Sequence, residues 1–88
     1  MNNELIKINN YLKNTYKTDR IKIIKNNSKD FKYSLLIDNI IIDELNSINT
    51  YDINNSLYYH FTAGESLDDE REYIKIIKKE LKLWKIII

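Results

Sequence analysis

The chain contains no cysteine and no proline, and it has one glycine, one alanine and one histidine. The absence of cysteine excludes disulfides, thiolate zinc sites and cysteine nucleophiles. The single glycine, Gly64, cannot form a glycine-rich loop that cradles phosphates. No stretch approaches the roughly 18 apolar residues of a membrane span, and the N-terminus lacks the apolar run of a signal peptide. We therefore expect no membrane association and no cofactor.

Isoleucine, asparagine, lysine and tyrosine fill more than half of the 88 positions, with 17, 12, 12 and 7 residues. The codons of these residues are rich in A and T, so the composition indicates an AT-rich bacterium, a phage or another mobile element. A hydrophobic content of 43% is sufficient for one core. We predict a single compact domain, residues 1–88, in the cytoplasm of the host cell.

The net charge of +1 results from three blocks of opposite sign. Residues 1–37 carry +5, residues 38–72 carry −8 and residues 73–88 carry +4. Such blocks form separate positive and negative surfaces if the fold keeps them apart, and these surfaces steer charged partners. The charge distribution is therefore the main clue to a partner.

The first part of the chain shows one helical pattern and then two strand patterns. Apolar residues recur at the spacing of one helical face: Leu5, Ile8, Leu12 and Tyr16. This spacing predicts a helix over residues 3–17. Residues 20–25 and 31–37 alternate between apolar and polar, which predicts two strands joined by a turn at residues 26–30.

A tight hairpin is predicted at Asp38-Asn39, which lies between two runs of apolar residues. A two-residue loop at this position sets the register of the two strands. Ile37 then faces Ile40, and Leu35 faces Ile42.

The second part of the chain is predicted to contain a connection, a strand and a long helix. Residues 46–55 are mostly polar and indicate a connection or a short edge strand. Residues 56–63 alternate, which predicts a fourth strand. Ser66 and Asp69 have the spacing of a capping box, which predicts a helix over residues 67–85.

These elements predict an α+β fold of two layers. An antiparallel sheet of three or four strands is expected to carry an N-terminal and a C-terminal helix packed on one face. A helical protein with a small hairpin is the alternative.

Residues suited to catalysis are scarce. His60 is the only histidine, so it has no second imidazole with which to share a metal, and a structural or surface role is expected. The serines lack the neighbours of a nucleophilic site. We predict no enzymatic activity and no metal site.

The acidic middle of the chain suggests a protein-docking surface. We predict a small inhibitor or interaction module from a phage or mobile element that binds a host protein, such as a nucleic-acid-binding defence enzyme. The predicted contact residues are acidic: Asp52, Glu65, Asp68, Asp69, Glu70 and Glu72.

The alternative function uses the opposite charge. Basic residues follow one face of the last predicted helix and could contact nucleic-acid phosphates: Arg71, Lys75, Lys78, Lys79, Lys82 and Lys85. The near-neutral net charge and the presence of only two arginines argue against base-specific recognition.

A homodimer is also predicted, because the apolar surface exceeds what one small core covers. The apolar face of the last helix, residues 86–88 and the pair Leu36 and Ile41 contribute to this surface. Glu80 interrupts that apolar face, so its carboxylate is expected to reach a lysine, a tyrosine hydroxyl or the rim of an interface.

Overall fold

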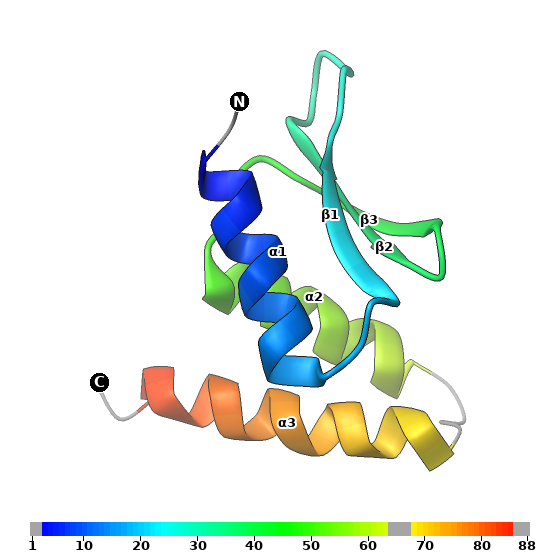
Figure 1. Cartoon of the computed structure of the whole chain (residues 1–88), viewed down its shortest axis with the longest axis vertical. Coiled ribbons are helices and arrows are strands. Elements are labelled where there is room, and N and C mark those ends of the chain that lie inside the picture. The colour runs from blue at the N-terminus through cyan, green and yellow to red at the C-terminus, as the bar shows by residue number, and fades with distance from the viewer. Residues whose placement is uncertain (1–2, 64–67, 86–88) are drawn as a thin grey trace. The chain divides into compact units, whose positions relative to one another are not determined.

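The computed structural model describes residues 3–63 and 68–85, and these form three helices and a three-stranded sheet (Figure 1). The elements follow in the order α1 (Asn3–Tyr16), β1 (Ile21–Lys25), β2 (Tyr33–Ile37), β3 (Ile40–Leu45), α2 (Thr50–Thr62) and α3 (Asp68–Lys85). The chain divides into two compact units, Met1–Asn49 and Thr50–Ile88. The α+β class is confirmed. The single domain and the packing of both terminal helices on one sheet face stay predictions.

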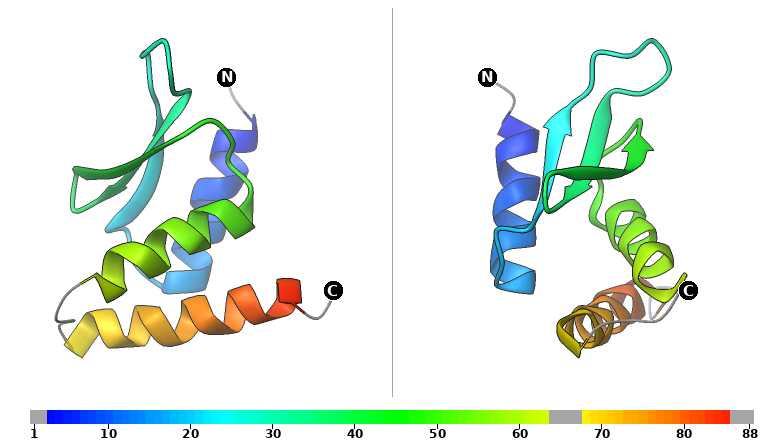
Figure 2. Two further views of the ribbon diagram at one scale, coloured as in Figure 1. Left: turned by 180° about the vertical axis from the view of Figure 1, so that it is seen from behind. Right: turned by 90° about the vertical axis from the view of Figure 1, so that its right-hand side faces the viewer.

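The sheet belongs to the first unit and is antiparallel, with the strand order β1-β2-β3 (Figure 2). The turn between β2 and β3 is formed by Asp38 and Asn39, whose φ angles are 53° and 66°. Two successive residues with positive φ are characteristic of the type I′ hairpin turn, and Asp and Asn tolerate this conformation better than most residues. The predicted hairpin is confirmed.

The register of this hairpin differs from the prediction at one position. Ile37 faces Ile40 as expected, but Leu35 lies opposite Asp43, so its predicted pairing with Ile42 is wrong. A bulge between Leu35 and Leu36 leaves Ile42 as the extra residue in β3.

The bulge in β3 follows two isoleucines that remain largely solvent-exposed. Ile40 is 68% exposed and Ile41 is 53% exposed, whereas Leu36 opposite Ile41 is buried. The homodimer stays a prediction, which sedimentation equilibrium would check.

Helix α1 lies beside β1 and closes the outer edge of that strand (Figure 1). Asn9 Oδ1 accepts a hydrogen bond from the Ile23 N–H at 2.8 Å, and Asn9 Nδ2 donates to the Ile23 carbonyl at 2.9 Å. The same Nδ2 donates to the Leu5 carbonyl at 3.0 Å, which fixes the amide on its own helix. One side chain thereby satisfies two backbone groups that an edge strand would otherwise present to another chain.

The end of α1 is one residue earlier than predicted. Lys17 has a φ of 56°, in the left-handed region, so it terminates the helix after Tyr16. Ile8, Leu12 and Tyr16 are buried, as their helical spacing indicates.

An ion pair joins the start of β1 to the end of β2. Arg20 donates from Nε to Asp38 Oδ1 and from Nη2 to Asp38 Oδ2, both at 2.8 Å. The Asp38 N–H also donates to the Arg20 carbonyl at 2.9 Å. These hydrogen bonds from the Arg20 guanidinium hold the pKa of the Asp38 carboxyl below its usual range.

The fourth strand predicted at residues 56–63 is wrong, because these residues belong mainly to helix α2. The buried apolar residues of α2 are Ile53, Leu57 and Phe61, which are four residues apart and therefore share one helical face. Ile53, Leu57 and Phe61 fit both periods, because positions four apart share a face in a helix and in a strand. Tyr59 identifies the helix, because a strand would place it on the buried face and it is 70% exposed. The connection predicted at residues 46–55 is correspondingly shorter and ends at Asn49.

Helix α3 is confirmed over Asp68–Lys85. The predicted start at Leu67 and the capping residue Ser66 lie outside the described residues, as do residues 86–88. Near the beginning of α3, the Tyr73 ring lies 5.5 Å from the ring of Phe61, near the end of α2. Ile77 is fully buried one turn further on. The two helices therefore form an antiparallel hairpin.

Candidate binding surface on the helical hairpin

One face of α2 carries a cluster of tyrosines. Tyr51, Asn55 and Tyr58 recur at intervals of four and three residues, and Tyr59 lies beside Tyr58. This face is distinct from the buried face of the helix. Tyr59 is 70% exposed and Tyr51 is 40% exposed, so both residues are accessible to solvent.

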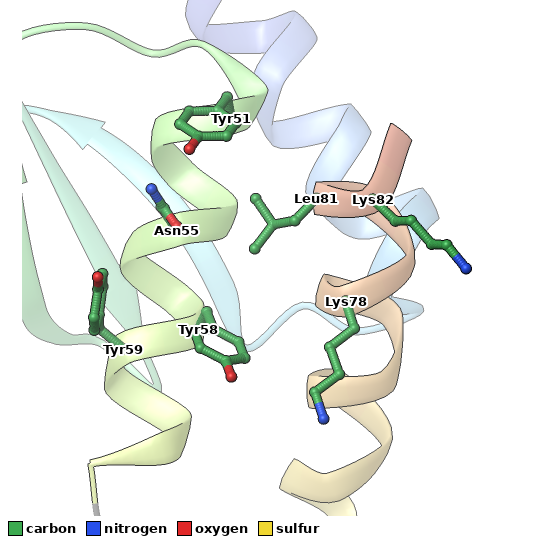
Figure 3. Close-up of a pocket in the computed structure, with 7 residues that line it drawn as sticks. All are labelled: Tyr51, Asn55, Tyr58, Tyr59, Lys78, Leu81 and Lys82. Atoms are coloured by element: carbon green, nitrogen blue, oxygen red, sulfur yellow. The ribbon is translucent and has the colours of Figure 1, made fainter. Parts of the chain in front are cut away.

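The tyrosine face of α2 lines a groove with α3 (Figure 3). The groove has a volume of about 680 Å³. From α3, the residues Lys78, Leu81 and Lys82 complete its lining. Figure 3 shows Leu81 and Tyr58 pointing toward the opposite helix. The Lys78 side chain extends along α3, and the Lys82 side chain extends outward from α3 on the side away from α2. A groove of this size is within the range of ligand-binding pockets, which is about 300–1,000 Å³.

Two rings of the cluster are arranged edge to face. The Tyr58 and Tyr59 ring centroids lie 6.3 Å apart, and the ring planes meet at 73°. This geometry is favourable for aromatic pairs. The half-buried Tyr58 therefore supports the more exposed Tyr59 in a defined orientation.

The predicted basic face of α3 is solvent-exposed. Its described members are Arg71, Lys75, Lys78, Lys79 and Lys82, and all five are exposed. The Lys75 Nζ lies 3.9 Å from Glu72 Oε2, a weak exposed pair. Among the residues that the structure describes, Lys78, Lys79 and Lys82 have no carboxylate at ion-pair distance. Lys85 lies in α3, but its side chain is outside the description.

Of the six predicted acidic residues, the structure describes the side chains of Asp52, Glu70 and Glu72. Asp52 is half-buried in the first turn of α2, while Glu70 and Glu72 lie in the first turns of α3. Because the helices run antiparallel, Asp52 lies at the opposite end of the hairpin from those two residues. Glu65 and the side chains of Asp68 and Asp69 lie outside the described residues.

Glu80 and His60 are placed on the same hairpin. Glu80 is half-buried in α3, and its predicted role at an interface stays a prediction. His60 is exposed, with its ring centroid 5.3 Å from that of Phe61. Within residues 3–63 and 68–85, no three acidic or histidine side chains are placed to hold a metal ion.

The tyrosine cluster is the part of this surface that sequence reasoning missed. The spacing of Tyr51, Asn55 and Tyr58 indicates a helical face, but it is visible only if α2 is recognised as a helix. The lysines were found because the helical period of α3 is unambiguous.

Comparison with known proteins gives no relative from which a function could be transferred. No family model matches the chain, and searches of curated proteins and of solved structures find no match. None of the helices in the described part of the chain is long and apolar enough to cross a membrane.

Proposed function

We propose that the protein is a non-enzymatic nucleic-acid-binding module that uses the α2–α3 hairpin as its contact surface. The observation that supports this most is the position of Lys78 and Lys82, two exposed cations along a groove lined by tyrosines. Neither lysine has a carboxylate partner among the described residues. Lysines of this kind neutralise phosphates and release the counterions bound to them, which favours binding.

The dimensions of the basic face suit a nucleic-acid backbone. From Arg71 to Lys82 the helix rises by about 16 Å at roughly 1.5 Å per residue. Along the axis of a double helix, one strand places a phosphate about every 3.4 Å, which gives about five phosphates over that distance. The five described cations of the face match this number of phosphates. Contacts of this kind are independent of base sequence, which agrees with the scarcity of arginine.

The competing proposal is an inhibitor that docks on a host protein through acidic residues. Glu72 supports it with a side chain that is 69% exposed, and tyrosines are enriched at protein interfaces as well. The separation of Asp52 from Glu70 and Glu72 weakens it, because a docking patch needs its charges on one surface. The geometry therefore favours the basic face.

Charge reversal tests the proposal. The triple variant Lys78→Glu, Lys79→Glu and Lys82→Glu is compared with the wild type by fluorescence anisotropy on a labelled 20-nucleotide thymidine strand. The wild type is expected to bind in the micromolar range or tighter at physiological salt. The variant is expected to lose most of that binding, with a slope of log K against log salt that is shallower by about 2.

A matched control variant changes the net charge by the same amount as the triple variant of α3, but at other positions. Lys25, Lys29 and Lys32 are exposed in the first unit, and their reversal to glutamate is expected to weaken binding far less. Equal losses in both variants would mean that only net charge matters.

A second arm separates the two proposed functions. The protein is used to capture partners from a host lysate with and without nuclease. Three results together would establish the acidic docking surface instead. The protein would not bind oligonucleotides, it would capture a protein partner that survives nuclease, and reversal of Glu70 and Glu72 to lysine would abolish that capture. A thermal melt must first show that each variant is folded.

A further inference from the structure

We infer that the hairpin groove takes single-stranded nucleic acid, with unpaired bases stacked on Tyr51 and Tyr59 while Lys78 and Lys82 contact the backbone. This inference rests on the proposed function and specifies its ligand. It depends on the tyrosines, whereas the proposed function depends on the lysines, so the two are tested separately.

The exposure of the rings is the first support. Tyr59 is 70% exposed and Tyr51 is 40% exposed, and both line the same groove. Singly exposed aromatic residues are common on protein surfaces, but several on one helical face form an apolar patch, which typically marks a contact site. Tyr58 holds the Tyr59 ring edge to face, so one face of that ring is oriented before any ligand arrives.

The spacing of the rings is the second support. Tyr51 and Tyr59 are eight residues apart on α2, which corresponds to about 12 Å along the helix axis. One strand of a stacked duplex rises by roughly 3.4 Å per nucleotide along its axis, and a strand with unstacked bases is longer per nucleotide, so this distance corresponds to at most about three to four nucleotides. Two bases of one short segment can therefore reach both rings, while the basic face of α3 follows the same direction across the groove.

Stacking on the tyrosine ring faces requires a ligand whose base faces are accessible, which is a single strand. In a duplex each base is covered above and below by its neighbours, so only base edges and the backbone are accessible to a protein. Unpaired bases expose their flat faces, and aromatic side chains bind these faces with little dependence on sequence. Tyrosines therefore add affinity for single strands and none for duplexes.

The test uses three probes of equal length with the wild-type protein. These are a labelled 20-nucleotide thymidine strand, a 20-nucleotide strand of abasic sites, and a 20-base-pair duplex. The abasic strand keeps the phosphates and removes every base. We expect the thymidine strand to bind about 5- to 100-fold more tightly than the abasic strand, the range typical of stacking on aromatic side chains.

Two double variants then test whether the rings of Tyr51 and Tyr59 are the ones that stack on the bases. Tyr51→Ala with Tyr59→Ala is expected to reduce thymidine-strand affinity to that of the abasic strand, while binding of the abasic strand is unchanged. Tyr51→Phe with Tyr59→Phe retains the ring faces and is expected to bind like the wild type. The phenylalanine variant also serves as the folded reference, because it changes only the two hydroxyl groups.

The outcomes distinguish the inference about base stacking from the proposed nucleic-acid binding. Equal affinity for the thymidine and abasic strands overturns the inference, as does an equal loss of strand and duplex binding in the alanine variant. So does an alanine variant that keeps the wild-type preference, or a phenylalanine variant that loses it. In these cases the proposed function is still supported if the triple lysine-to-glutamate variant loses oligonucleotide binding. If the wild type binds none of the probes, both fail, and the tyrosines are assigned to a protein contact.

Discussion

The two units of the chain differ in how their polar side chains are used. In the sheet unit, polar groups bind one another: Asn9 binds the backbone of Ile23, Arg20 binds Asp38, and Asn26 donates from Nδ2 to Ser34 Oγ at 2.9 Å. In the hairpin unit, a face of lysines and tyrosines remains exposed to solvent beside a groove.

This difference assigns a role to each unit. Side chains that satisfy the backbone and each other stabilise a fold but leave few groups for a partner. Exposed cations and aromatic rings contribute little to stability but offer charge and contact area. In the proposed function, the sheet unit is the scaffold and the hairpin unit is the binding surface.

The largest effect is expected in the core of the hairpin. Ile77 is fully buried in α3, so Ile77→Ala should lower the free energy of unfolding by about 2–5 kcal/mol. Tyr59→Ala should change it by less than about 0.5 kcal/mol, because that ring is mostly exposed. Urea denaturation followed by circular dichroism measures both. A similar loss for the two variants would show that the tyrosine face belongs to the core.

The same measurement tests the prediction of a single domain. If the two units unfold together, Ile77→Ala shifts one transition that is identical for every probe. Two separate transitions, with only one affected by the substitution, would mean that the sheet unit folds without the hairpin.

The second prediction concerns the polar contacts of the sheet unit. Asn9→Ala removes the amide that binds the Ile23 N–H and carbonyl, and it should cost about 1–3 kcal/mol of the free energy of unfolding. The neighbouring Asn10 is exposed, and Asn10→Ala should leave stability unchanged or raise it by about 0.5 kcal/mol through better helix propensity. Hydrogen exchange at the Ile23 amide should also accelerate in the Asn9 variant. Unchanged exchange would show that the edge of β1 is covered without this side chain.

Sequence reasoning succeeded where local chemistry decides the structure. The hairpin at Asp38-Asn39 follows from two residues that tolerate positive φ between apolar runs. Helices α1 and α3 follow from a clear period. These features require no knowledge of distant contacts.

Sequence reasoning failed where two patterns overlap or where a distant partner decides. Leu57 and Phe61 fit a strand as well as a helix, and the difference is visible only in the exposure of Tyr59, which a strand would place on the same face as those two residues. The bulge at Ile42 arises from pairing across the sheet. The tyrosine groove could not be predicted because it requires α2 to be a helix and to lie beside α3. Asp52 was grouped with the acidic residues of α3, whereas helix direction separates it from Glu70 and Glu72.

A smaller effect is expected at the end of α1. Lys17 has a φ of 56°, a conformation that is unfavourable for residues with a Cβ atom and natural for glycine. Lys17→Gly should therefore raise the free energy of unfolding by up to about 1 kcal/mol. Lys7 is exposed inside the same helix, and Lys7→Gly should lower the free energy by about 1 kcal/mol. Thermal melts of the two variants should shift in opposite directions. Destabilisation by both would show that the Lys17 side chain has a contact that outweighs its backbone conformation.

The smallest effect is expected from the ion pair between Arg20 and Asp38, because both side chains are partly exposed to solvent. The pKa of Asp38 is lowered in the folded protein, mainly by the hydrogen bond from Arg20. A lowered pKa means that the ionised carboxylate favours the folded state. Its contribution is complete above the unfolded pKa of about 3.9 and is lost as the pH falls through the lower folded value.

The variant Asp38→Asn isolates this contribution, since asparagine also tolerates the positive φ of 53° but cannot ionise. The stability difference between wild type and variant should be constant from about pH 5 to 8 and should shrink below about pH 4. It should also decrease at high salt, because exposed charges are screened. Other carboxylates titrate in both proteins and cancel in the difference. A difference that persists unchanged to pH 2 would show that the carboxylate charge of Asp38 does not stabilise the sheet unit, and that the contact with Arg20 is maintained by the backbone hydrogen bond alone.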